Sequence, residues 1–243
     1  MSGFAPIRCG PHRALVRRDL LPLADALLRS EGERMNVFGR GRCERVRAAG
    51  RLFVRKRLAH GGLLAPLLGP RFLRRGRLAD AIRNFLRLRA ADVPVAPVAA
   101  VAWSRVAGTL RLVLVTEYLP GVTLAEHLRA GGSFPYAALA DTLRRAFDAG
   151  FAPVDLTPEN LRVLPGGDVA LLDIEDAGLR SCALPSRLRT SILVRFGRAL
   201  FKRRFMPGAV SRTALLRLLL ALEIEPRGYC AALAGQLRLH RIL

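Results

Sequence analysis

Apolar residues alternate with polar ones in some stretches of the chain and recur every three or four residues in others. Alternation is typical of strands, and we expect strands at 51–58, 98–103, 110–117, 161–163 and 169–172, the last two joined by a Pro-Gly-Gly-Asp turn. The longer spacing predicts amphipathic helices at 19–28, 77–91, 123–130, 134–149, 192–204, 211–222 and 230–239. Thr123 with Glu126, and separately Ser211, are expected to cap two of these helices.

The order of these elements predicts a bilobal α+β fold. We expect a β-rich N-lobe at 1–117 and a helical C-lobe at 118–243. In the predicted strand 51–58, a period of two places Lys56 on one face with three apolar residues, Leu52, Val54 and Leu58. We therefore expect Lys56 to face the interior, where its charge needs an anion. The alternative is a lysine at the end of its strand that extends into solvent.

Basic residues dominate the charge of the chain. The formal net charge is +21, and lysine occurs only at Lys56 and Lys202, so that 38 of the 40 basic residues are arginines. Such a skew indicates a compositional bias, and most of these arginines should be solvated surface charges. A basic surface favours anionic partners, but nucleic acid is an unlikely one here because aromatic residues make up 6% of the chain and no recognition motif is found.

The four cysteines lie far apart, without disulfide or metal-ligand spacing, and this favours a reducing compartment. No signal peptide and no apolar window of about 18 residues is evident. We therefore expect a cytoplasmic location.

Three polar residues, Asp155, Asn160 and Asp173, follow a spacing that is typical of a phosphotransferase site. The asparagine comes five places after the first aspartate, and the second aspartate follows the predicted hairpin. Transfer of a phosphoryl group from ATP needs a carboxylate that orients the attacking hydroxyl, oxygen ligands for Mg²⁺ and a cation on the phosphates. Asp155 could supply the first, Asn160 and Asp173 the second, and Lys56 the third. The alternative is a simple β-hairpin with incidental acidic residues. Gly39 and Gly41 could let backbone N–H groups approach a triphosphate, or they could form an ordinary turn.

Several motifs in the same order resemble those of the lipopolysaccharide kinases (Kdo kinase and heptose kinase type), which have a protein-kinase-like fold. The resemblance covers residues 38–204 and includes the Gly39-Arg-Gly41 loop, Val54-Arg-Lys56, His60-Gly-Gly-Leu63, the proline loop at 93–97, the hinge-like segment 116–121 and the acidic motif 173–180. It implies an ATP- and Mg²⁺-dependent kinase that phosphorylates a glycolipid sugar or another small hydroxyl substrate. It also implies nucleotide contacts at the hinge residue Glu117. Glu175, two residues after Asp173, could assist as a third metal ligand.

Three positions depart from the family pattern. Pro153 replaces the histidine two residues before the catalytic aspartate, the metal motif reads Asp-Ile-Glu, and Asn84 stands where a helix glutamate should hold Lys56, with Asp80 one turn earlier as a substitute. A pseudokinase that binds nucleotide or acts as a scaffold is therefore the alternative function.

The predicted helix 192–204 has an apolar side and a cationic side. It could lie on an anionic membrane surface, which predicts peripheral association with the inner face of the cytoplasmic membrane. Alternatively, its apolar side packs into the C-lobe and leaves the charges solvated.

Overall fold

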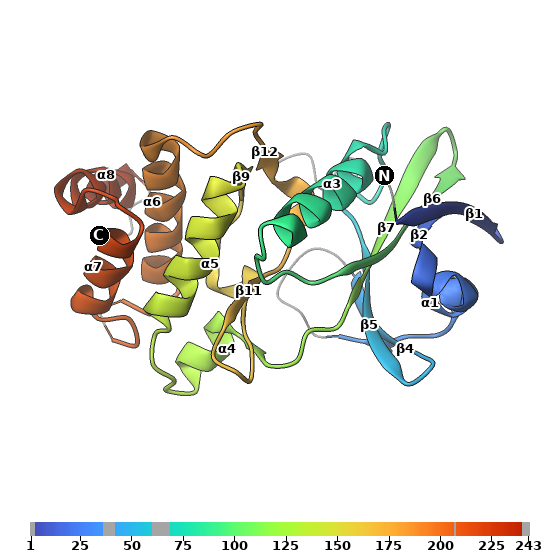
Figure 1. Ribbon diagram of the computed structural model, residues 1–243, viewed down its shortest axis with the longest axis horizontal. Coiled ribbons are helices and arrows are strands. Elements are labelled where there is room, and N and C mark those ends of the chain that lie inside the picture. The colour runs from blue at the N-terminus through green and yellow to red at the C-terminus, as the bar shows by residue number, and fades with distance from the viewer. Residues whose placement is uncertain (1–2, 36–41, 60–68, 207, 240–243) are drawn as a thin grey trace. The chain divides into compact units, whose positions relative to one another are not determined.

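The computed structural model describes residues 3–35, 42–59, 69–206 and 208–239 (Figure 1). The chain divides into two compact units, one of residues Met1–Phe85 with Ala96–Tyr118 and the other of Leu86–Val95 with Leu119–Leu243. The predicted N-lobe range 1–117 thus includes the segment Leu86–Val95, which packs with the second unit.

The first unit is built on a seven-stranded antiparallel sheet in the order β1-β2-β6-β7-β5-β4-β3. The strands are β1 (Phe4–Cys9), β2 (His12–Arg17), β3 (Glu33–Arg34), β4 (Arg42–Ala48), β5 (Arg51–Arg57), β6 (Val98–Val106) and β7 (Thr109–Glu117). A 3-10 turn η1 (Arg18–Leu23) leads into helix α1 (Ala24–Arg29), and helix α3 (Gly76–Ala90) begins in this unit. The predicted strands 51–58, 98–103 and 110–117 and the helix 77–91 are confirmed, whereas the hairpin β1–β2 was not predicted.

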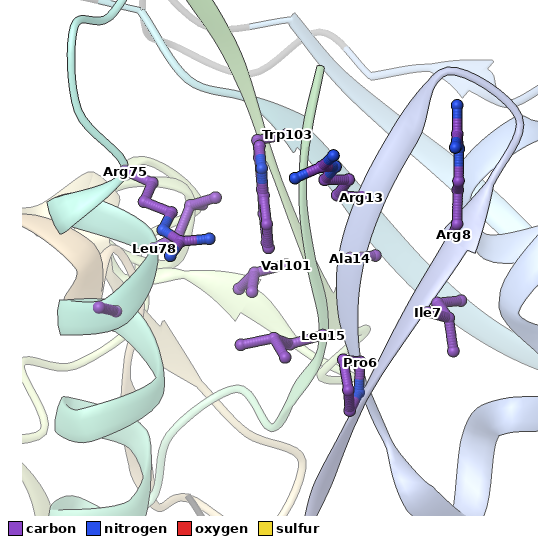
Figure 2. Close-up of a pocket in the computed structure, with 11 residues that line it drawn as sticks. Pro6, Ile7, Arg8, Arg13, Ala14, Leu15, Arg75, Leu78, Val101 and Trp103 are labelled. Carbon is purple, nitrogen blue, oxygen red and sulfur yellow. The ribbon is translucent and has the colours of Figure 1, made fainter. Parts of the chain in front are cut away.

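One face of this sheet is covered by η1 and α1. Leu20 and Leu27 belong to the same buried cluster as Val16, Phe53 and Val115 from three strands. Burying such apolar side chains contributes about 1.5–3 kcal/mol each relative to exposure. On the opposite face, Leu78 at the start of α3 approaches Val101 of β6, and both side chains are buried (Figure 2).

The face of β5 that carries Lys56 is not the more buried face of the strand, as the sequence had predicted it to be. The fully buried positions of β5 are Phe53 and Arg55, which face α1, whereas Leu52, Val54 and Lys56 are only half-buried. Arg55 is 7% exposed. Its guanidinium donates to Glu44 Oε2 at 2.6 Å and to the Ser30 carbonyl at 2.8 Å. A charge can be buried when it is paired and hydrogen-bonded in this way. The buried face of β5 therefore includes an arginine and is not purely apolar.

The second unit is mostly helical (Figure 1). Its helices are α4 (Leu124–Arg129), α5 (Tyr136–Asp148), α6 (Ser186–Lys202), α7 (Arg212–Ala221) and α8 (Pro226–Leu239), with 3-10 turns η3 (Pro158–Asn160) and η4 (Ile174–Asp176). Strands β8 (Val122–Thr123), β10 (Leu161–Val163) and β11 (Val169–Leu171) form one small sheet, and β9 (Phe151–Ala152) pairs with β12 (Gly178–Leu179). Helix α5 packs against α7, and α6 packs against α8 (Figure 1).

Both predicted helix caps are present. Thr123 Oγ1 accepts a hydrogen bond from the Glu126 amide, and the Glu126 carboxylate accepts one from the Thr123 amide. Ser211 Oγ accepts from the Ala214 amide at 3.1 Å. Each cap satisfies amide groups that the first turn of a helix leaves without an intrahelical partner.

The apolar side of α6 lies in the core of the second unit. Ile192, Phe196 and Leu200 are fully buried, and Val194 and Ala199 are 2% and 8% exposed. That side is therefore not available to a lipid surface, and only the cationic side of the helix is left for such a role. In the described part of the chain, no helix has the length and apolar character needed to cross a membrane.

Candidate active site

The loop that carries Asp155 and Asn160 is held between two short strands. Before the loop, β9 pairs with β12, in the register Phe151 with Leu179 and Ala152 with Gly178. Gly150 has a φ of +80°, and a Cβ atom there would collide with the Arg180 carbonyl. The Arg180 amide donates to the Gly150 carbonyl at 2.9 Å. The pairing thus joins the start of the Asp155 loop to the end of the segment that carries Asp173.

Asp155 and Asn160 are directly connected. Asn160 Nδ2 donates a 2.8 Å hydrogen bond to the Asp155 carbonyl, which closes the loop across five residues. This bond uses the amide nitrogen of Asn160 and leaves Oδ1 as an acceptor. Within the described residues, neither Oδ1 nor the exposed Asp155 carboxylate takes part in an interaction. Both groups are thus open to a ligand.

Asp173 follows strand β11, and a backbone hydrogen bond joins the residue before it to this loop. The amide of Leu172 donates to the Asn160 carbonyl at 2.9 Å, so the residue before Asp173 is bonded to the backbone of Asn160. Asp173 is exposed and adopts a left-handed conformation with φ of +57°. Aspartate is among the few non-glycine residues that tolerate this conformation. Non-glycine residues held in such an uncommon backbone conformation by the surrounding structure often lie at functional sites.

Oxygen donors of this kind fit Mg²⁺. This ion is usually bound in nucleotide sites by one or two carboxylates together with phosphate oxygens and water. Asn160 Oδ1 and the Asp173 carboxylate match that donor set in chemical type. Glu175, the third predicted ligand, is buried, with 2% of its surface exposed.

An ion pair that the sequence did not reveal fixes the far side of the loop. Glu159, which directly precedes Asn160, accepts a 2.5 Å hydrogen bond from Arg203 Nε, at the end of α6. The Glu159 side chain is 14% exposed and that of Arg203 is 28% exposed. Arg195 of α6 also donates to the Pro153 carbonyl, at 3.5 Å. The partners are 44 and 42 residues apart, and the sequence gives no signal for such pairs.

The remaining predicted site residues lie in the first unit or outside the described residues. Lys56 is a half-buried residue of β5. Glu117 ends β7, and its carboxylate accepts from Arg17 at 2.6 Å and from Arg51 at 2.9 Å. Gly39 and Gly41 lie outside the described residues.

The two helix residues considered as partners for Lys56 differ in their surroundings. Asn84 is 2% exposed within α3. Asp80 is half-buried and forms an ion pair with Arg83, one turn along the same helix. Asp80 therefore already has a cationic partner.

A β-rich N-terminal unit followed by a helical unit with a central hairpin defines the bilobal, protein-kinase-like class of α+β fold. Among solved structures, the chain resembles WaaP, solved in complex with acyl carrier protein. The TM-score is 0.63, the sequence identity is 19%, and the match covers 95% of this chain and 99% of that one. The fold predicted from the sequence is thereby confirmed.

A structure of the bifunctional kinase-methyltransferase WbdD also matches, over 74% of this chain and 42% of that one, with 19% identity. Its TM-score of 0.43 is too low to support an inference. No protein-family profile matches the chain, and no curated protein sequence matches it.

Proposed function

We propose that this protein is an ATP-dependent phosphotransferase of the lipopolysaccharide kinase type. The observation that carries the proposal is the closed loop in which Asn160 Nδ2 binds the Asp155 carbonyl, while the Asp155 carboxylate and Asn160 Oδ1 have no partner among the described residues. The hydrogen bond holds these two residues together at one loop. Here they are left open to a substrate and a metal ion.

In this proposal, each residue has a distinct role. Asp155 orients the acceptor hydroxyl and takes its proton, and Asn160 with Asp173 holds Mg²⁺, with Glu175 as a further ligand. Lys56 neutralises the phosphates, and Gly39, Gly41 and Glu117 belong to the nucleotide-binding segment. Bound Mg-ATP supplies the phosphoryl group, and the metal ion stabilises charge on its oxygens.

We further propose that the acceptor is a sugar hydroxyl of a glycolipid, or another small hydroxyl substrate, at the cytoplasmic face of the membrane. The sequence resemblance supports this substrate class. Because the apolar side of α6 is buried in the core, any contact with anionic lipid would use surface cations such as Lys202. Such attraction weakens as salt increases.

The experiment compares the wild-type protein with Asp155→Asn, and with Asp168→Asn as a matched control. Asp168 is an exposed aspartate in the hairpin turn of the same unit. We expect Asp155→Asn to lower phosphoryl transfer by about 10²- to 10⁴-fold, the usual contribution of a positioned acid or base, without a change in melting temperature. Asp168→Asn should retain activity. Equal activity of wild type and Asp155→Asn would disprove the assignment.

A pseudokinase is the second candidate, favoured by Pro153 and by the buried Asn84 at the helix position. Thermal shift in millimolar Mg-ATP, measured for wild type, Lys56→Met and Asp173→Ala, separates the two functions when combined with the transfer assay. A shift that both variants reduce, together with turnover, supports the kinase. The same shift without turnover for any acceptor supports a pseudokinase that binds nucleotide. No shift at all contradicts the kinase and favours a pseudokinase that acts as a scaffold.

A further inference from the structure

A cavity lies within the first unit, and no residue of the proposed kinase chemistry lines it. Its volume is about 690 Å³, within the range of about 300–1,000 Å³ that is usual for small-molecule sites. It is formed where the hairpin β1–β2 extends the sheet next to the start of α3 (Figure 2). The lining residues are Pro6, Ile7, Arg8, Arg13, Ala14, Leu15, Arg75, Leu78, Ala79, Val101 and Trp103.

Three arginines and no acidic residue line this cavity. Arg8 of β1 and Arg13 of β2 are directly opposite each other in the antiparallel register, and both side chains are exposed. Like charges in opposite positions of a strand pair are destabilising. Within the described residues, neither arginine forms an ion pair or a hydrogen bond through its side chain. The pair is thus a site of uncompensated positive charge.

The rest of the cavity is apolar and aromatic. Leu78 and Val101 form a buried floor, and Leu15 is half-buried beside them. Trp103 is the partner of Arg13 in the β2–β6 register. On its other side, the Arg75 guanidinium lies 4.9 Å from the Trp103 ring centroid (Figure 2). The indole is therefore fixed between cationic residues at the edge of an apolar surface.

We propose that this cavity binds a single-chain lipid anion, with its phosphate or carboxylate head group on Arg8 and Arg13 and its alkyl chain against Leu15, Val101 and Trp103. Arginine forks match phosphate and carboxylate geometry, and the apolar floor accounts for the chain. A purely ionic ligand would leave the apolar floor unused, and a neutral one would leave the arginine pair unneutralised. The site is independent of the proposed kinase activity.

Trp103 allows a direct test because it is the only tryptophan of the chain. Its fluorescence is measured during titration with octyl, decyl and dodecyl phosphate below their critical micelle concentrations. We expect saturable binding that strengthens roughly three- to fourfold for each added CH₂ group, the factor that corresponds to about 0.8 kcal/mol. Two control ligands should bind at least tenfold more weakly than decyl phosphate. Inorganic phosphate has the anionic head group without a chain, and decyl maltoside has the chain with a neutral head group.

The variant Arg8→Gln/Arg13→Gln should bind decyl phosphate at least tenfold more weakly. Its melting temperature should not fall, because the substitution removes two like charges that face each other. Arg47→Gln is the control: Arg47 is an exposed strand arginine of the same unit but does not line the cavity. An equal loss in Arg47→Gln, equal affinity for inorganic phosphate or decyl maltoside, or equally strong competition by a poly-glutamate peptide would each overturn the proposal.

Discussion

The ion pair between Glu159 and Arg203 makes a testable link between the end of α6 and the Asp155 loop. Replacing Arg203 by methionine keeps much of the aliphatic stem but removes the guanidinium. The Glu159 carboxylate would then lose its 2.5 Å partner in a setting where it is 14% exposed. The nearest remaining cation is Arg129, whose guanidinium is 3.9 Å from Glu159 Oε1.

The expected cost follows from this geometry. A hydrogen bond to a charged group contributes about 1.5–3 kcal/mol, and the 28% exposure of Arg203 places the value toward the lower half of that range. We therefore expect a loss of about 2 kcal/mol in the free energy of unfolding, or a fall of about 4–8 °C in melting temperature for a chain of this size. Lys202→Met, at the neighbouring exposed position on α6, should change the stability by less than about 0.5 kcal/mol.

A double-mutant cycle isolates the pair. Urea unfolding of Arg203→Met, Glu159→Gln and the double variant should give a coupling energy of at least about 1 kcal/mol. If the protein transfers phosphate as proposed, Arg203→Met should also lower kcat by up to about 100-fold with little change in KM, because a shift of about 1 Å in a catalytic group has effects of that size. A coupling energy below about 0.3 kcal/mol would show that the pair does not hold the loop.

Two further predictions concern stability. Thr142 is 1% exposed and donates to the Val169 carbonyl at 2.7 Å. Thr142→Val should lower the free energy of unfolding by about 1–3 kcal/mol, measured in urea, because it leaves a buried acceptor unpaired. The control Thr190→Val removes an exposed hydrogen bond to the Ser186 carbonyl in α6 and should be nearly neutral. Burial, together with the charges of Arg57, Arg55 and Arg29, lowers the pKa of His12 below 6.5. As pH falls, the unfolded chain therefore takes up a proton before the folded protein does. The free energy of unfolding should decrease as pH falls through 6.5 toward the folded-state pKa, and it should decrease less in His12→Gln. A slope that His12→Gln leaves unchanged would assign the pH dependence to other groups.

The elements that sequence periodicity predicted are those in which local pattern and burial agree. The helix 77–91 and the hairpin 98–117 have regular apolar spacing, and both are present as α3 and as β6–β7. The hairpin β1–β2 was missed because the apolar residues Pro6 and Leu15 share a face with Arg8 and Arg13, so that neither strand alternates clearly. The Gly10-Pro11 pair between the two strands was the available signal, since such pairs mark turns.

The prediction of which face of β5 is more buried failed for a different reason. Alternation identified the strand, but the choice of buried face assumed that an arginine would not be inside. Arg55 is buried because Glu44 and the carbonyl groups of Leu27 and Ser30, at the end of α1, satisfy its guanidinium. These partners lie 11 to 28 residues away in the chain. Side-chain pairing over such distances cannot be inferred from the periodicity of one strand.

The same distinction applies to the candidate site. The proximity of Asp155 and Asn160 could be predicted because five residues form one loop, and a single hydrogen bond closes it. The anchors at Arg195 and Arg203 could not be predicted, because they depend on how α6 packs against the loop. These anchors bear on Pro153, which replaces a histidine of the family pattern. The loop is fixed at its start by β9–β12 pairing and at its end by Glu159, and neither contact uses a side chain at position 153. The missing histidine is therefore weak evidence against turnover. The choice between kinase and pseudokinase depends more on Asn84, which replaces the helix glutamate of the family pattern in the unit that carries Lys56.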